Sequence, residues 1–102
     1  MRRALVFVQD RPAGVLSESA EGAFVFAYDG GYQGPPVSFT MPTSQRQYHF
    51  KTFPPFFDGL LPEGFQLEAL LRTEKIDKRD YFAQLVAVGA DLVGDVTVKS
   101  EK

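Results

Sequence analysis

The chain has 102 residues, of which 44% are hydrophobic, and this length predicts a single domain, residues 1–102, with one core. It contains no cysteine, which excludes disulfides, thiolate metal sites and a cysteine nucleophile and favours the cytoplasm. The net charge is -2 and the basic residues are scattered, so we expect no direct nucleic-acid binding. The apolar stretches are too short or too charged to predict a membrane span.

The first half of the chain has the pattern of short strands separated by turns. Residues 4–8 are rich in β-formers, residues 10–14 supply turn chemistry, and residues 15–17 return as the second arm of a hairpin. Aromatic residues alternate along residues 24–28 and predict a third strand. The clearest period-two pattern predicts a fourth strand in residues 37–41, where apolar and hydroxyl side chains alternate: Val37, Ser38, Phe39, Thr40 and Met41.

The second half changes to a helical period. Asp77 can cap a helix, residues 81–88 carry apolar side chains at helical spacing, and Gly89 fits a C-terminal stop. Residues 91–94 predict a turn into a last strand, residues 96–98. The expected fold class is α+β, with a small antiparallel sheet of about five short strands and two to three helices packed on one face.

The segment from Phe53 to Phe65 contains four of the ten phenylalanines and is punctuated by Pro and Gly. Pro62 suits the first turn of a helix, in which Leu67, Leu70 and Leu71 share the core-facing side and Phe65 points away. An outward aromatic ring in a polar surround is typical of an interface anchor. In the alternative interpretation, Gly64 breaks or delays the helix and turns Phe65 into the core.

Catalytic chemistry is poorly supported by the sequence. The single histidine, His49, lies in a probable strand with no Ser, Asp or Glu at a spacing that suggests a proton relay. Asp91 and Asp95 are explained by turn formation. The glycines at 30, 31 and 34 lack the spacing and the following helix of a phosphate loop. We therefore expect no enzymatic activity, no cofactor and no metal site.

Three motifs, in the order 36–42, 56–64 and 89–96, give the chain a family resemblance. Their sequences are PVSFTMP, FFDGLLPEG and GADLVGDV. The chain resembles, over essentially its whole length, the N-terminal subdomain of HipA-type serine/threonine kinases. HipA polypeptides continue into a much larger kinase body, whereas this sequence ends. A chain consisting of this subdomain alone is similar to the HipS proteins of three-component HipBST toxin–antitoxin systems.

The resemblance implies an antitoxin that binds and inhibits a separate HipA-like kinase, HipT, by docking beside its active site, with HipB as the DNA-binding member of a ternary complex. Two other classes remain open: a non-inhibitory scaffold that completes the kinase fold and supports assembly with HipB, and a small enzyme or ligand-binding domain acting alone. The residues expected to bind the partner begin with the anchor Phe65, followed by Glu63, Gly64, Asp58, Glu68 and Arg72.

Overall fold

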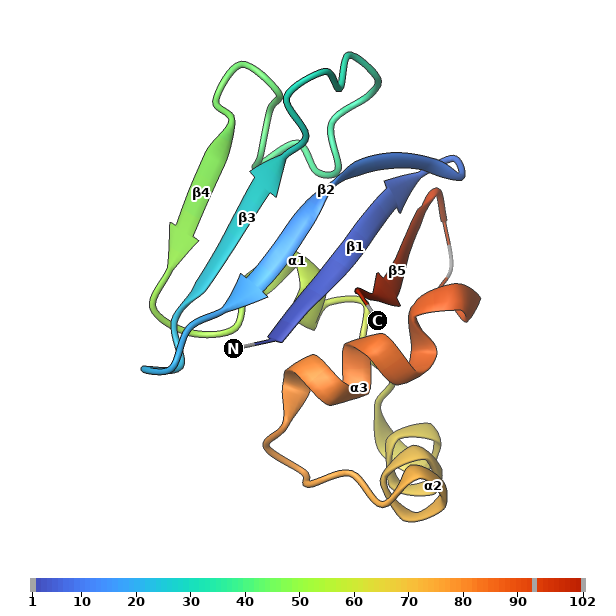
Figure 1. The fold of residues 1–102 in the computed structure, drawn as a ribbon. Coiled ribbons are helices and arrows are strands. Elements are labelled where there is room, and N and C mark those ends of the chain that lie inside the picture. Colours follow the sequence, from blue (N-terminus) through green and yellow to red (C-terminus); the bar gives the residue numbers. More distant parts are fainter. Residues whose placement is uncertain (1, 93, 102) are drawn as a thin grey trace.

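The computed structural model describes residues 2–92 and 94–101, and within this part of the chain five strands form one antiparallel sheet (Figure 1). The strand order is β4-β3-β2-β1-β5. Three α-helices and a 3₁₀ helix accompany the sheet, which confirms the expected α+β class. The elements are β1 (Arg2–Val8), β2 (Arg11–Glu18), β3 (Phe24–Tyr28), β4 (Gln47–Phe50), α1 (Pro55–Asp58), α2 (Gly64–Glu74), α3 (Tyr81–Val88), η1 (Gly89–Asp91) and β5 (Val96–Ser100).

The first hairpin is tighter than the sequence predicts. Its turn uses Gln9 and Asp10 alone, with φ of 51° and 65°, the left-handed conformations that a two-residue hairpin turn requires. The second strand therefore begins at Arg11, and the prediction that residues 10–14 form the turn is wrong. Pro12 pairs with Phe7 where the register shifts, a position at which its missing N–H is tolerated.

The predicted strand over residues 37–41 is also wrong, because the chain turns there. The N–H of Met41 donates to the carbonyl of Ser38 at 3.0 Å, so Val37 and Met41 are buried whereas Phe39 is 98% exposed. The Tyr28 hydroxyl holds both sides of this turn: it accepts from the N–H of Val37 at 2.9 Å and donates to the carbonyl of Met41. Burial raises the pKa of Tyr28 above its ordinary value, which keeps the proton on this donor.

The fourth strand is β4, which pairs with β3 at one edge of the sheet. His49 lies in this strand and is exposed, as expected for a surface histidine on a strand. Its nearest partner across the ladder is Val25.

The core lies on one face of the sheet. Fully buried Phe26 and Leu16 point from the central strands toward Phe57 of α1 and Leu85 of α3, and the ring centroids of Phe26 and Phe57 are 6.0 Å apart. Apolar side chains on the opposite face, among them Leu5 and Val15 and Val25, are only half-buried. In the described part of the chain, the buried helical side chains come from α1 and α3 (Figure 1).

Asp80, and not Asp77, is the N-cap of α3. Its Oδ1 accepts from the N–H of Ala83 at 3.1 Å, and the same oxygen lies 2.9 Å from Nη2 of Arg2. The Asp77 carboxylate instead accepts from the N–H of Arg79 at 2.8 Å, which fixes the turn before the helix. Buried Gln84 donates to the carbonyl of Lys78 at 2.9 Å, so the turn is also held from inside. The predicted helix start was therefore three residues early.

Gly89 is the C-cap of α3, in agreement with the predicted C-terminal stop, and close packing explains why this residue is glycine. Its φ is -57°, and the chain continues into η1. A Cβ at this position would lie 1.9 Å from the carbonyl oxygen of Val98, so glycine allows α3 to approach β5 closely. The predicted turn over residues 91–94 includes Val93, which lies outside the described residues.

Replacing Gly89 with Ala should destabilise the fold by about 1–3 kcal/mol, because the new methyl group meets a backbone carbonyl that cannot move without disturbing β5. Urea unfolding measures the effect. Gly31→Ala is the matched control, since a Cβ there has no neighbour within 4 Å, and it should change stability by less than about 0.5 kcal/mol. Equal effects of the two substitutions would contradict this packing.

The ion pair at the start of α3 predicts a pH-dependent stability. The hydrogen bond from Arg2 is the main cause that lowers the pKa of Asp80 below its ordinary value of 3.8. A carboxylate with a lowered pKa stabilises the fold above its unfolded-state pKa, and that contribution is lost as the pH falls through the folded-state pKa.

Asp80→Asn keeps an N-cap acceptor but removes the charge. At pH 7 it should lower the free energy of unfolding by no more than about 1 kcal/mol, because the pair is partly exposed to water. The difference from the parent, measured by urea unfolding, should shrink between pH 5 and pH 3. Glu21→Gln removes an exposed carboxylate and is the control. A difference for Asp80→Asn that is constant across this range would exclude the proposed role of the charge.

Candidate partner-binding surface

The phenylalanine-rich segment divides into a core part and a surface part. Phe53 packs edge-on against Phe24 with ring centroids 5.3 Å apart, and Phe57 is fully buried. After α1 the chain turns through two hydrogen bonds between residues three apart, from the N–H of Leu60 to the carbonyl of Phe57 at 3.1 Å and from the N–H of Leu61 to that of Asp58 at 3.2 Å. Phe56 is half-buried, with its ring centroid 5.2 Å from that of Phe57, and the fourth phenylalanine, Phe65, lies beyond this turn.

Phe65 is 90% exposed at the start of α2. Gly64 has φ of 60°, so the helix begins there and not at Pro62 as predicted. This delay does not turn the ring inward: the outward orientation is confirmed, and the alternative interpretation with Phe65 in the core is wrong. Glu63 is extended and its carbonyl accepts from the N–H of Leu67 at 3.4 Å.

Two of the other predicted partner-binding residues lie on the same side of α2 as Phe65. Glu68 and Arg72 follow Phe65 at helical spacing of three and seven residues, so they lie on the same side of α2. All six predicted residues are exposed and come from one continuous stretch of chain, residues 58–72. Their arrangement is that of a solvated surface around one aromatic ring. Their contact with a partner stays a prediction.

α2 packs less tightly than the sequence predicts. Leu67, Leu70 and Leu71 are only half-buried, and no residue of this helix is buried. The expectation that Leu70 belongs to the core is therefore wrong: the sheet face is already covered by α1 and α3.

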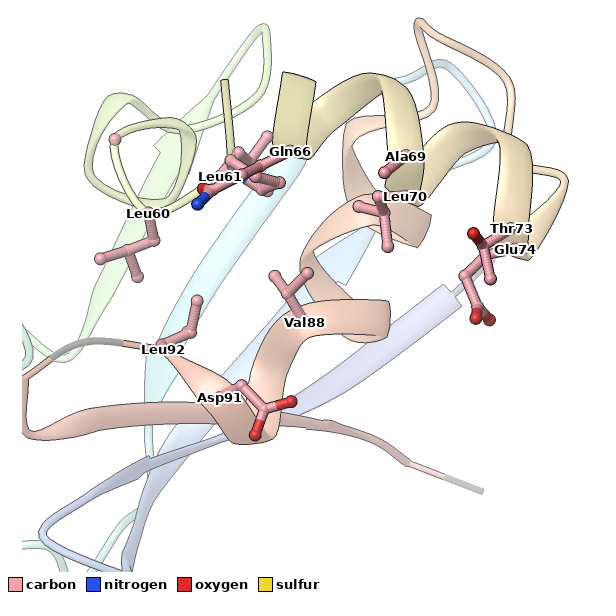
Figure 2. A pocket seen from close by; sticks show the side chains of 12 residues that line it. Leu60, Leu61, Gln66, Ala69, Leu70, Thr73, Glu74, Val88, Asp91 and Leu92 are labelled. Carbon is pink, nitrogen blue, oxygen red and sulfur yellow. The ribbon is translucent and has the colours of Figure 1, made fainter. Parts of the chain in front are cut away.

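An open groove separates α2 from α3 and the segment after it (Figure 2). Its volume is about 730 Å³. Leu70 of α2 faces Val88 and Leu92 across this space, and Leu61 closes one end. The groove adjoins the surface around Phe65 through Gln66, which is among its lining residues.

The described residues provide neither a metal site of three such ligands nor a membrane-spanning helix. Among residues 2–92 and 94–101, no three His, Asp or Glu side chains are placed to hold a metal ion together. Within the same residues, no helix has the length and apolar character needed to cross a membrane. The surface offers an aromatic ring, aliphatic side chains and carboxylates, which are groups for binding another macromolecule.

Comparison with known proteins identifies the family. The profile of the HipA N-terminal domain matches residues 4–99. The chain belongs to the HipA N-terminal domain family. The resemblance inferred from the three sequence motifs is thereby confirmed, and the matched region is a non-catalytic part of HipA.

Two similar proteins cover the whole chain. A solved structure described as the N-terminal domain of HipA toxin superposes with a TM-score of 0.79 at 32% identity, covering 100% of this chain and 94% of that one. An uncharacterized protein of Haemophilus influenzae is 34% identical over 102 residues, 100% of this chain and 95% of the relative. Each alignment covers all of this chain and nearly all of the other protein.

Sequence reasoning missed the exposure of another aromatic side chain, Phe39, which is 98% exposed. The period-two pattern around it suggested a half-buried strand, but the chain turns instead. The turn residues that surround it, Ser38, Thr40 and Pro42, were the available signal. The groove was missed as well, because it is formed by segments far apart in the sequence.

The loose packing of α2 predicts a contrast between two leucines. Leu85→Ala should cost about 2–5 kcal/mol, because it leaves a cavity in the core beside α3. Leu70→Ala should cost less than about 1.5 kcal/mol, because this side chain is only half-buried and lines an open groove, so its removal leaves no closed cavity. Urea unfolding of both variants measures the difference, and similar losses would show that α2 is an integral part of the core.

Proposed function

We propose that this chain is a HipS-type antitoxin that binds a separate HipA-like serine/threonine kinase, of the HipT kind, and inhibits it by docking beside its active site. The observation that carries the proposal is Phe65, a ring left 90% exposed on a helix that contributes nothing to the buried core. Removing such a side chain from water is worth about 1.5–3 kcal/mol. A partner that covers it gains this free energy.

The neighbouring residues support a specific orientation of that partner. Gly64 adopts φ of 60°, a conformation that glycine reaches without strain, and it lets Phe65 project from the first turn of α2. Exposed Glu63 and Asp58 offer carboxylates to basic kinase residues, and Glu68 and Arg72 lie at the rim. Charges at the rim influence association rate and orientation more than affinity.

The proposed inhibition is steric and requires no chemical step from this chain. Residues 1–102 act as one docking unit in the cytoplasm, and the turn around Phe65 obstructs the catalytic cleft or holds it in an unproductive arrangement. A HipB-like DNA-binding protein is the third member of the proposed complex. The family match to a non-catalytic part of HipA supports a binding role over an enzymatic one.

A second candidate function is favoured by the structural match itself. The superposed domain is described as part of the HipA toxin, so the domain is compatible with an active kinase. As a scaffold, the chain completes the kinase fold and supports assembly with the HipB-like protein. Purified chain added to the kinase separates the two functions: an inhibitor lowers autophosphorylation and growth arrest, whereas a completing subunit raises both.

Replacing Phe65 with Ala should weaken kinase binding by about 2 kcal/mol, roughly thirtyfold, because a buried aromatic anchor is lost. Calorimetric titration with the kinase measures the affinity, and autophosphorylation measures the inhibition. Thermal unfolding should be unchanged, since the ring contacts water in the free chain.

Phe39→Ala is the matched control. Phe39 is 98% exposed, and Figure 1 places its loop at the opposite end of the molecule from α2. Its loss should leave inhibition within about twofold of the parent. If Phe65→Ala inhibits the kinase as well as Phe39→Ala does, Phe65 is not the anchor.

A further inference from the structure

The groove between α2 and α3 is an apolar surface without an occupant from the described part of this chain. Its walls carry half-buried aliphatic side chains from both sides: Leu61, Leu70, Val88 and Leu92. Pockets of about 300–1,000 Å³ accept ligands of drug size. At about 730 Å³ the groove therefore accommodates several side chains of another molecule, not one.

The charged residues that line the groove are acidic, and this favours an occupant with positive charge. Its charged lining residues among those described are Glu74, at the end of α2, and Asp91, in η1, and both carboxylates are exposed. The described lining contains no Lys or Arg. Figure 2 shows Glu74 on α2 and Asp91 on the opposite wall of the gap. An occupant that combines aliphatic residues with a positive charge complements this surface.

The groove also adjoins the surface around Phe65, which is the part of this chain proposed to bind the kinase. Gln66 is one of its lining residues and follows Phe65 along α2. One helix therefore carries the exposed ring and one wall of the groove. A partner that covers Phe65 is positioned to send a segment into the groove.

We propose that the groove binds a short amphipathic segment of the same kinase, with aliphatic residues against Leu70 and Val88 and Lys or Arg beside Glu74 and Asp91. This inference rests on the proposed function, because the partner is the kinase. It goes further by assigning a second contact, separate from Phe65, and by stating the chemistry of the segment that enters.

Obstructing the groove tests the proposal. Thr73 is exposed, lines the groove and lies eight residues beyond Phe65, so Thr73→Arg introduces bulk and positive charge there without removing a core contact. It should weaken kinase binding at least tenfold, as measured by calorimetric titration. Thr52→Arg is the matched control: it makes the same change at an exposed position outside the groove and should leave binding within about twofold.

Reversing the charge of Glu74 tests whether the bound segment is positively charged. Glu74→Lys should weaken binding by about fivefold at low ionic strength, and the loss should diminish at high salt because exposed charges are screened. Glu21→Lys changes the net charge equally at a distant exposed site and should have little effect. Unchanged or tighter binding by Glu74→Lys would overturn the assignment of a basic segment.

Photo-crosslinking in the complex with the full-length kinase separates failure of this inference from failure of the proposed function. The photoreactive residue p-benzoylphenylalanine is placed at position 65, 73 or 52, and the crosslinked kinase peptide is sequenced. Crosslinks from 65 and 73, with the latter on a segment containing aliphatic residues and Lys or Arg, support both proposals. Crosslinks from 65 but not from 73 overturn the groove assignment alone, and none from either position overturns both.

Discussion

The packing of α1 and α3 on one face of the sheet is the constraint on which the rest of the structure depends. Phe57 and Leu85 cover the central strands, where Leu16 and Phe26 are fully buried. A sheet of five short strands has a limited buried face, and two helices fill it. No such surface is left for α2, which retains exposed and half-buried apolar side chains. The exposed Phe65 and the groove are two consequences of the same arrangement.

The position of α3 relative to the sheet is fixed by polar contacts at one end and by close backbone packing at the other. Arg2 of β1 donates to Glu18 of β2 at 2.7 Å and to Asp80 at 3.0 Å, and its guanidinium lies 4.9 Å from the centre of the Phe82 ring. At the far end, Gly89 allows contact with Val98. Because Val88 precedes this glycine, the same packing sets one wall of the groove.

Local chemistry allowed much of this fold to be predicted, and tertiary contacts explain the errors. The content of β-formers correctly placed the strand at residues 4–8, alternating residues correctly placed those at 24–28 and 96–98, and helical geometry correctly turned Phe65 outward. The pattern at residues 37–41 misled because the Tyr28 hydroxyl, distant in sequence, stabilises a turn there. Asp77 and Asp80 are equally good caps by residue type, and the contacts of Asp80 with Arg2 and of Gln84 with Lys78 are not visible in the local sequence. The partial burial of Leu70 depends on space already occupied by other helices.

The energetics of association favour an interface larger than one aromatic ring. Two separate chains lose translational and rotational freedom on binding, at a cost estimated as about 4–15 kcal/mol. Burial of Phe65 contributes only about 1.5–3 kcal/mol to the binding free energy. An exposed ion pair, such as one between Glu63 and a basic partner residue, contributes about 0–1 kcal/mol. A domain joined covalently to its kinase avoids most of this cost, because its local concentration is already high. The proposed antitoxin function on a separate chain requires additional apolar area, and the groove beside Phe65 offers it in its aliphatic walls.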